Sequence, residues 1–288
     1  MDRRNPHIPL DRSLIQHFLK GRDIRSTELI KAGKSNTNYK LLLSDDQICV
    51  LRLYAHGDAG REVFVMSMVS DMIPVPRELD RGEGWSIFEF LHGDHLAIKP
   101  QNTDVAAEAL ARISSITFEK PGLVNPDGTI SPFDFEEEDF VHQQLKRDEV
   151  TRWVGQEVIE KVLIILGRES QRLEELGAES RLIHGDFNPT NILVHNGSVS
   201  GILDWEFSMS GTPYMDIGNL FRHSKPGYRG LIEKGLLDGG MDLQSDWRER
   251  AELVDLGSHL EFLTSARSDE FKIECVSRIH RFINLFDS

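Results

Sequence analysis

The spacing of apolar positions changes along the chain. Four short runs rich in β-forming residues come first and predict strands, at residues 26–32, 39–43, 48–54 and 86–91. Phe64, Met68 and Met72 recur at four-residue spacing and predict a helix over residues 60–74. Helical spacing appears earlier at 10–19, and it dominates later, over residues 104–118, 141–176 with breaks, and 246–286. This order predicts an α+β fold, with a small antiparallel sheet and one helix followed by a larger, mainly helical part.

One late segment interrupts the helical pattern. Residues 192–195 and 198–203 are rich in β-formers and flank the dipeptide Asn196-Gly197. Asn-Gly between two such runs is a strong hairpin signal, because a type I′ turn needs positive φ at both central residues. The segment therefore predicts a β-hairpin within the helical part.

The predicted turn also sets a register. It makes His195 face Ser198, and counting back places Asn191 opposite Ile202. Asp204 then lies just beyond the open end of the hairpin. The hairpin thus brings an amide and a carboxylate together, at the end where the preceding loop also arrives.

That loop carries a second carboxylate, Asp186. Phosphoryl transfer needs positioning, cations on the phosphates and an acceptor for the proton of the nucleophile. Magnesium prefers hard oxygen ligands, which Asn191 and Asp204 can supply. Asp186 remains free to orient a hydroxyl and take its proton. The constellation predicts a magnesium-dependent phosphotransferase.

The triplet His-Gly-Asp occurs three times, ending at Asp58, Asp94 and Asp186. Only the third is followed five residues later by asparagine and then by an Asn-Gly hairpin. The first two are expected to be ordinary turns.

Composition and net charge limit the kinds of partner that the protein can bind. The 288 residues include 33 basic and 47 acidic side chains, a net charge of −14, which repels nucleic acid and anionic lipid. This charge either attracts a cationic substrate or serves solubility alone, as in many cytoplasmic proteins. No apolar run reaches the roughly 20 residues that span a bilayer, and no apolar core follows the basic N-terminus as in a secretory signal. The two cysteines form no CxxC pair, which predicts a cytoplasmic protein without a disulfide framework or zinc site.

The string LIHGDFNPTNILV, followed by GILDWEFSMSGTPYMDIGNL, closely resembles the aminoglycoside phosphotransferase family. That family shares the two-lobed architecture of protein kinases. The resemblance implies Asp186 as catalytic base and Asn191 and Asp204 as magnesium ligands. It also implies that His184 braces the catalytic loop and that Asp216 ties the loop backbone together. The resemblance runs from about residue 26 to residue 225.

The N-terminal half resembles the same family more loosely. KAGKSNTNYKL is similar to its nucleotide loop, in which Gly33 permits a tight approach and the N–H groups of Ser35 and Asn36 face phosphate oxygens. A polar hairpin tip would have the same appearance. The segment is neither a GxxxxGK[ST] loop nor a GxGxxG loop, which disfavours a P-loop ATPase.

The strand that follows supplies further expected contacts. VLRLY carries Arg52 as the phosphate anchor where protein kinases have lysine, and its fork can still bind phosphate oxygens. Glu62 on the next helix would pair with Arg52; the alternative is an exposed carboxylate at the helix start beside Arg61. FEFL resembles the hinge between the lobes, where the carbonyl of Glu89 and the N–H of Leu91 would meet adenine.

The resemblance divides the chain into a nucleotide-binding lobe at 1–91 and a helical lobe at 92–288. It implies ATP, with GTP not excluded, and Mg²⁺ as cofactors, and an aminoglycoside or another amine-bearing hydroxylated small molecule as acceptor. The acidic stretch 133–140 is either a rim for such a cation or a helix start, where carboxylates meet the positive end of the dipole. Glu206, Asp255 and Glu261 are further possible cation contacts.

Other functions fit the same fold. Choline, homoserine, methylthioribose, fructosamine and macrolide kinases share it, although HGDFNPTN differs from the choline- and macrolide-kinase loops. A catalytically silent nucleotide-binding module would lack one of Asp186, Asn191 and Asp204, and all three are present. A protein kinase is disfavoured because the His-Arg-Asp, Asp-Phe-Gly and Ala-Pro-Glu segments are missing from the sequence. The sequence leaves the oligomeric state open.

Overall fold

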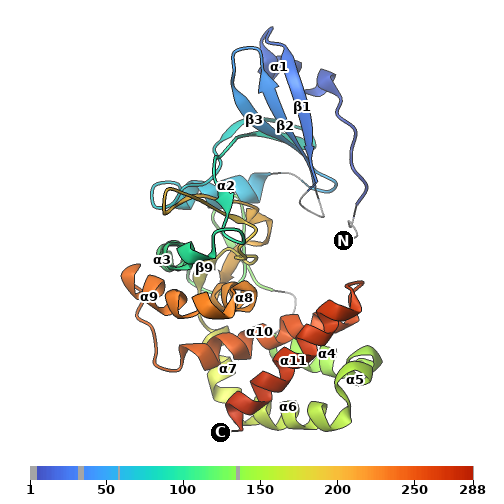
Figure 1. The fold of residues 1–288 in the computed structure, drawn as a ribbon, viewed down its shortest axis with the longest axis vertical. Coiled ribbons are helices and arrows are strands. Elements are labelled where there is room, and N and C mark those ends of the chain that lie inside the picture. Colours follow the sequence, from blue (N-terminus) through green and yellow to red (C-terminus); the bar gives the residue numbers. More distant parts are fainter. Residues whose placement is uncertain (1–4, 32–35, 58, 134–136, 288) are drawn as a thin grey trace.

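The computed structural model describes residues 5–31, 36–57, 59–133 and 137–287, and it places them in two lobes (Figure 1). One lobe holds an antiparallel five-stranded sheet, and the other is mainly helical. This confirms the predicted α+β order, with the strands first. The predicted division between residues 91 and 92 falls in the connection between the two lobes and stays a prediction.

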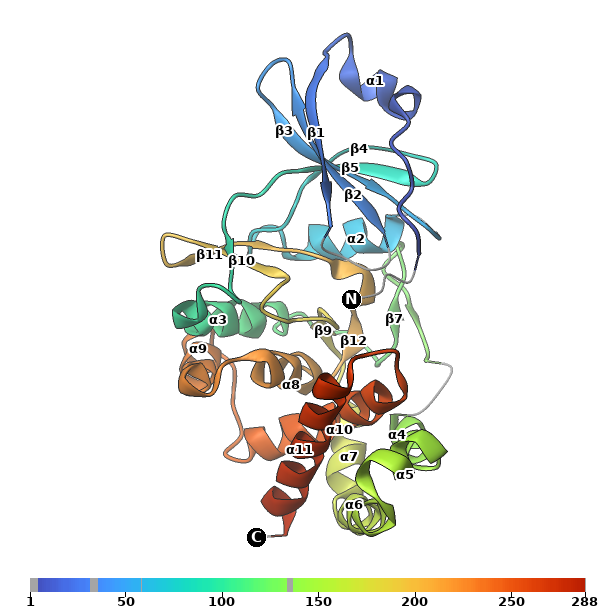
Figure 2. The same ribbon diagram turned by 45° about the vertical axis from the view of Figure 1, so that its right-hand side comes forward.

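The sheet lobe begins with two short helical segments, η1 (Arg12–Ile15) and α1 (Gln16–Leu19), where the sequence predicts one helix at 10–19. A left-handed residue, Lys20 with a φ of 48°, ends α1. The strands, in the order in which they lie side by side, are β1 (Ile24–Ile30), β2 (Thr37–Leu43), β3 (Ile48–Leu53), β5 (Trp85–Glu89) and β4 (Glu78–Gly82). Helix α2 (Gly60–Val69) connects β3 to β4 and lies beneath the sheet, toward the helical lobe (Figure 2).

Alternation within the strands separates the two faces of the sheet. In β3, Cys49, Leu51 and Leu53 are buried, whereas Arg52 projects from the opposite face. The buried face packs against α1 and forms a small hydrophobic cluster, which we call the sheet cluster. Its buried members are Ile15, Phe18, Leu41, Leu43, Cys49, Leu51, Leu53, Trp85 and Ile87.

The helical lobe also contains short strands near its upper end. These are β6 (Asp94–His95) beside the hairpin β10 (Ile192–His195) and β11 (Ser198–Ile202), β9 (Arg181–Ile183) beside β12 (Met209–Gly211), and β7 (Leu123–Val124) beside β8 (Ile130–Ser131). Its helical segments are η2 (Pro100–Asn102), α3 (Thr103–Ile113), α4 (Glu137–Leu145), α5 (Asp148–Val154), α6 (Gln156–Arg168), α7 (Ser170–Gly177), η3 (Trp205–Phe207), α8 (Tyr214–His223), η4 (Pro226–Tyr228), α9 (Gly230–Asp238), α10 (Trp247–Thr264) and α11 (Asp269–Phe286).

A second, larger hydrophobic cluster fills the helical lobe, and we call it the helical cluster. It includes Val65, Met66 and Val69 of α2 together with Cys275 of α11. Helix α2 follows the third strand in the sequence, yet its buried apolar residues belong to this cluster and not to the sheet cluster. The connection between the lobes is therefore a packed one.

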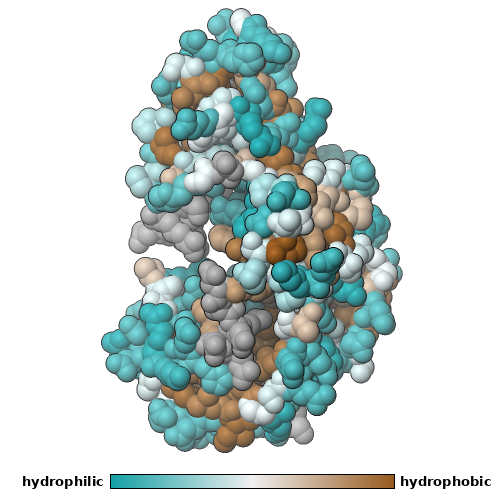
Figure 3. Space-filling model, turned by 180° about the vertical axis from the view of Figure 1, so that it is seen from behind, coloured by the Kyte–Doolittle hydropathy of each residue, from teal (hydrophilic) through white to brown (hydrophobic). Residues whose placement is uncertain are grey.

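The face of the molecule seen from behind is mainly hydrophilic, with several apolar areas (Figure 3). Among the residues that the structure describes, none of the helices combines the length and apolar character needed to cross a bilayer. Of the acidic stretch 133–140, residues 134–136 lie outside the described part of the chain, and α4 begins at Glu137.

Candidate active site

The hairpin β10–β11 has the turn that the sequence predicts. Asn196 and Gly197 have φ values of 49° and 79°, as a type I′ turn requires. His195 pairs with Ser198 across the turn, which confirms the predicted register at this end.

The predicted register is wrong at the open end of the hairpin. Ile202 pairs with Ile192 and not with Asn191, because a β-bulge in the middle shifts the pairing by one residue. Asn191 instead accepts a hydrogen bond from the N–H of Leu203 through its carbonyl oxygen, at 2.8 Å. Since Leu203 directly precedes Asp204, the bulge brings Asp204 closer to Asn191 than the simple count implies.

Three amide groups hold the carboxylate of Asp186. The Nδ2 atom of Asn191 donates to Oδ2 at 2.9 Å, and that of Asn188 donates to Oδ1 at 2.9 Å. The Nδ2 atom of Asn219, on α8, lies 3.4 Å from the same Oδ1. Because the amide nitrogen of Asn191 faces Asp186, its amide oxygen points away from that carboxylate. Asn188 and Asn219 are partners of Asp186 that the sequence pattern does not predict.

His184 joins the loop of Asp186 to the segment before Asp204. Its Nε2 donates to the carbonyl of Leu203 at 2.9 Å, and its Nδ1 accepts from the backbone N–H of Asp186 at 3.2 Å. The ring is fully buried, and burial lowers its pKa. It is therefore a neutral bracing group with both nitrogens engaged, which confirms the predicted structural role.

Asp216 ties the same loop from below. Its carboxylate accepts from the backbone N–H of His184 at 2.6 Å and from that of Gly185 at 2.9 Å. Burial raises the pKa of Asp216 to about 7, although these two hydrogen bonds act in the opposite direction. Gly185 has a φ of 80°, and a Cβ there would lie 2.3 Å from the carbonyl oxygen of Phe207. The conformation of the loop thus depends on the buried carboxylate of Asp216, which accepts two hydrogen bonds, and on Gly185, which has no side chain.

Arg52 connects the sheet to this arrangement. Its guanidinium contacts Glu62 at 2.5 Å, Asp204 at 3.3 Å and the side-chain oxygen of Asn38 at 3.2 Å. The side chains of Arg52 and Glu62 are 12% and 7% exposed, so the pair is largely shielded from water. The predicted pairing is confirmed, and the alternative of an exposed Glu62 is wrong.

Asp204 itself has an unusual backbone. Its φ and ψ are 68° and 59°, a left-handed conformation that is uncommon for a residue with a side chain. The Oδ1 atom faces Arg52, and the side chain is 29% exposed. Such local strain concentrates at functional sites, where the surroundings hold it in place.

The nucleotide loop is only partly described. Gly33 and Ser35 lie outside the described residues. Asn36 is described, and its Nδ2 atom donates to the carboxylate of Glu206 at 3.1 Å. Glu206 lies two residues after Asp204. Glu89 ends β5. Leu91 follows it and packs against Gly201, where a Cβ would lie 2.6 Å from Leu91 Cδ1.

A series of buried contacts connects Asp186, through Asn219, to the interior of the helical lobe. The Nη2 atom of Arg222 donates to Oδ1 of Asn219 at 3.1 Å, and its Nη1 pairs with Asp255. Asp255 also faces Nε2 of His259 at 3.3 Å. Because Asp255 is buried against an arginine, the sequence-based expectation that it contacts a substrate amine is not supported.

Comparison with known proteins decides the family. A family model described as the phosphotransferase enzyme family matches residues 26–253. The chain belongs to the phosphotransferase enzyme family. It is accordingly a small-molecule phosphotransferase, which moves a phosphoryl group from ATP to a hydroxyl. No curated protein sequence matches this phosphotransferase significantly.

Solved structures share the fold of this phosphotransferase at low sequence identity. Macrolide 2′-phosphotransferase MphH from Brachybacterium faecium has a TM-score of 0.66 at 14% identity, covering 94% of this chain and 98% of that one. A thermostable mutant of aminoglycoside phosphotransferase APH(4)-Ia, in complex with AMP-PNP and hygromycin B, has a TM-score of 0.67 at 18% identity, covering 94% and 98%. A proposed fructosamine-3-kinase from Thermobifida fusca has a TM-score of 0.67 at 15% identity, covering 93% and 99%.

Proposed function

We propose that Asp186 is the catalytic base, that Asn191 and Asp204 bind Mg²⁺, and that Arg52 anchors the phosphates of ATP. The observation that carries the proposal is the fixed carboxylate of Asp186 beside a hairpin end that also carries Asp204. Arg52 reaches Asp204 from the sheet, so that a cation from one lobe and oxygen ligands from the other converge. This is the arrangement that in-line phosphoryl transfer requires.

The residues present fit a magnesium ion. No group of three or more His, Cys, Asp or Glu side chains suited to a metal occurs within the described residues. A kinase-type magnesium needs only one or two protein oxygens, because phosphates and water supply the rest. Asn191 has its amide oxygen directed away from Asp186, and Asp204 is partly exposed. When bound, the ion would neutralise charge on the transferred phosphoryl group.

The remaining nucleotide contacts are proposed from the resemblance. Gly33, Ser35 and Asn36 would meet the phosphates, and Glu89 and Leu91 would meet adenine through their backbones. The neighbour crystallised with AMP-PNP supports a nucleotide site in this fold. A backbone hinge does not by itself separate ATP from GTP, and a direct comparison of the two as phosphate donors tests the choice.

For the acceptor we propose a hydroxylated, amine-bearing small molecule such as an aminoglycoside. The net charge of −14 supports a cationic ligand. An aminoglycoside phosphotransferase and a proposed fructosamine-3-kinase, both of which have this fold, extend the support to sugars that carry amino groups. A kinase of another small metabolite is the alternative, and phosphorylated-product masses from a mixed acceptor panel distinguish the two.

The test of the mechanism is Asp186→Asn, with ADP release measured in the presence of Mg²⁺ and the acceptor panel. Loss of the base should lower kcat about 10²- to 10⁴-fold. Asp94→Asn is the matched control, because Asp94 ends another His-Gly-Asp triplet but is exposed and paired with Lys99. Equal ADP release from Asp186→Asn and wild type would refute the assignment of the base.

A further inference from the structure

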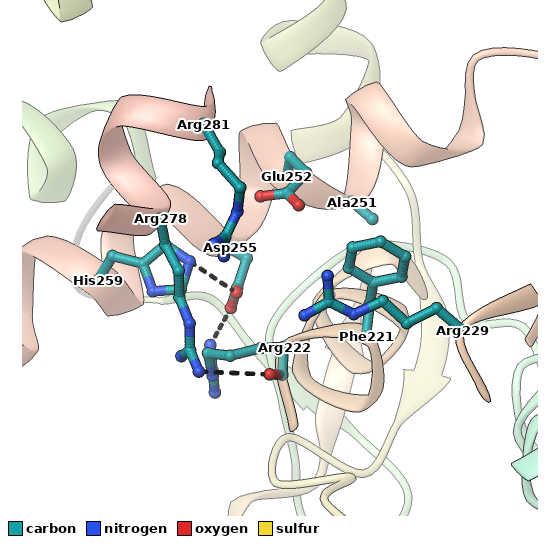
Figure 4. A pocket seen from close by; sticks show the side chains of 10 residues that line it. Phe221, Arg222, Arg229, Ala251, Glu252, Asp255, His259, Arg278 and Arg281 are labelled. Atoms are coloured by element: carbon teal, nitrogen blue, oxygen red, sulfur yellow. Dashed lines mark hydrogen bonds and ion pairs between the residues drawn. The ribbon is translucent and has the colours of Figure 1, made fainter. Parts of the chain in front are cut away.

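A pocket lined by arginines lies between α8, α10 and α11 (Figure 4), and one of its lining residues, Arg222, contacts Asn219. Its lining includes four arginines and two carboxylates, an excess of two positive charges in a protein of net charge −14. These charged residues are Arg222, Arg229, Arg278, Arg281, Glu252 and Asp255. The pocket therefore has a local charge opposite to that of the whole protein.

Only part of this positive charge is matched within the protein. Arg222 pairs with Asp255, and both are buried. Arg278 reaches Glu274 at 3.5 Å, but that carboxylate is 64% exposed. Among the described residues, Arg229 and Arg281 have no carboxylate within ion-pair distance. Glu252, which lines the same pocket, interacts with both of these arginines at longer range, so two cations share one carboxylate there.

Buried donors also remain unused at the pocket. The Nε atom of Arg229 and the Nη1 atom of Arg278 are buried and have no hydrogen-bond partner within the described part of the chain. The Nδ1 atom of His259 is also buried without a partner, but it is an acceptor in the neutral ring, because Nε2 faces the carboxylate of Asp255. A buried guanidinium N–H without a partner is costly, so such groups normally mark a bound water or ion.

The titration behaviour of the neighbours agrees with a positive local field. The pKa of His259 is held well below its usual value by burial and by Arg222, Arg278 and Arg281. Burial and the charge of Asp255 raise the pKa of Glu252, whereas Arg281, Arg229 and Arg278 act to lower it. The arginines thus lower the pKa of both lining residues, as a positive local field does.

The dimensions limit what can enter. The pocket offers about 10 Å³ of space to water-sized groups, which is room for a single oxygen-sized group, and it is partly open to solvent. Arg281 at the rim is exposed, and Arg229 and Arg278 are half-buried. The shape suits the anionic end of a molecule whose remainder lies outside.

We propose that this pocket binds a carboxylate or phosphate group of a small molecule. This proposal rests on the proposed role of Asp186 as catalytic base. Arg222 and Asn219 connect the pocket to Asp186, with contacts of 3.1 Å between Arg222 and Asn219 and 3.4 Å between Asn219 and Asp186. An anion that draws Arg222 toward the pocket would change how Asn219 holds Asp186. The acceptor itself can supply the group, so that it carries an acid beside its hydroxyl, or a separate anion can.

Phosphate binding tests the pocket directly. Inorganic phosphate is titrated into the full-length protein by calorimetry at constant ionic strength, with saturating ADP and Mg²⁺ present so that the nucleotide site is filled. Arg229→Gln combined with Arg281→Gln should weaken binding about tenfold or more, because two charged donors are lost. Arg248→Gln, an exposed arginine on α10, is the matched control and should leave affinity unchanged. Equal phosphate affinity in wild type and the double variant, or no saturable binding, would overturn the proposal.

The two sources of the anion are separated by kinetics on a panel of hydroxy acids and amino alcohols. Competitive inhibition by phosphate against the acceptor, with a raised KM for hydroxy acids in the double variant, assigns the group to the acceptor. Noncompetitive inhibition that the double variant abolishes assigns the site to a separate anion. ADP affinity is measured on the same proteins. If wild type binds no nucleotide, the proposed function fails while the phosphate result stands.

Discussion

Asp186 receives hydrogen bonds from three amides, two from its own loop and hairpin and one from α8, and together they fix the orientation of its carboxylate. Asn191 was identified by its spacing from Asp186, and the same string contains Asn188. Asn219 comes from a distant helix, and nothing in local spacing connects it to Asp186. Residues that share a loop or hairpin can be paired by counting. Those that meet through packing between elements cannot.

The loop backbone at Gly185 leads to a first prediction about stability. Gly185→Ala should destabilise the protein by about 2–4 kcal/mol, since the φ of 80° is unfavourable and the added Cβ would collide with the Phe207 carbonyl oxygen. Urea unfolding provides the free energies. Gly177→Ala, in α7, is the control, because a Cβ added there would have no neighbour within 4 Å, and a helical alanine should be neutral or stabilising. Similar free energies for the two variants would contradict the steric argument.

The raised pKa of Asp216 leads to a pH prediction. The folded protein binds a proton at this carboxyl as pH falls through about 7, whereas the unfolded chain does so near 3.8. Between these values the folded state holds more protons, so Asp216 contributes stability that grows as pH falls and is lost as pH rises to 7. Wild type should gain up to about 1.4 kcal/mol per pH unit relative to Asp216→Asn as pH falls from 7 to 4.

Urea denaturation at several pH values measures this difference. Asp242→Asn, at an exposed loop position, provides the control and should run parallel to wild type. A constant difference between wild type and Asp216→Asn over that range would show that the buried carboxyl does not titrate there.

At the scale of elements, the sequence predicts which helices and strands exist better than it predicts the register of a hairpin or the edge strand of a sheet. The Asn196-Gly197 turn identifies the hairpin, but the bulge that shifts Ile202 onto Ile192 has no local signature. The edge strand β4 was not predicted, because its sequence ELDRG is charged and lacks β-formers. The sequence predicts a role for Asp216 but no helix around it, although α8 carries both Asn219 and Arg222.

Arg52, on β3, contacts Asn38 on β2, Glu62 on α2 and Asp204 before η3. Its replacement should show whether its charge alone or its forked guanidinium is needed for nucleotide binding. Arg52→Lys keeps a charge near Glu62 but cannot also reach Asp204 and Asn38, because a single ammonium replaces a planar fork. We expect nucleotide affinity to fall about tenfold in Arg52→Lys and further in Arg52→Ala, with acceptor preference unchanged. Calorimetry with ADP and Mg²⁺ measures the affinities, and Arg25→Lys, on an exposed part of β1, is the control. Unchanged nucleotide affinity in both Arg52 variants would remove Arg52 from the phosphate site.

At the scale of the whole molecule, the buried apolar residues form two separate hydrophobic clusters, and those of α2 belong to the helical cluster. Composition and periodicity predicted two parts, because strand-like and helix-like spacings occupy different stretches. They did not predict that α2 packs with the helical cluster, since an apolar helix face does not specify which lobe will cover it. The ion pair between Arg52 and Glu62 consequently joins the sheet to a helix held by the other lobe. Movement of the sheet relative to the helical lobe would have to break that pair.

Each cluster contains one of the two cysteines, Cys49 in the sheet cluster and Cys275 in the helical cluster, and both are buried. Burial raises the pKa of both thiols, that of Cys49 to about 11, so alkylation requires local opening. We expect Cys49 to be labelled faster than Cys275, because the smaller cluster opens more easily. Peptide mass spectrometry after timed exposure to iodoacetamide gives both rates, and equal labelling in urea is the control. Identical rates in the native protein would mean that the clusters open together. The natural sequence thus contains a separate chemical reporter for each half of the molecule, with which lobe opening can be followed without introducing any new residue.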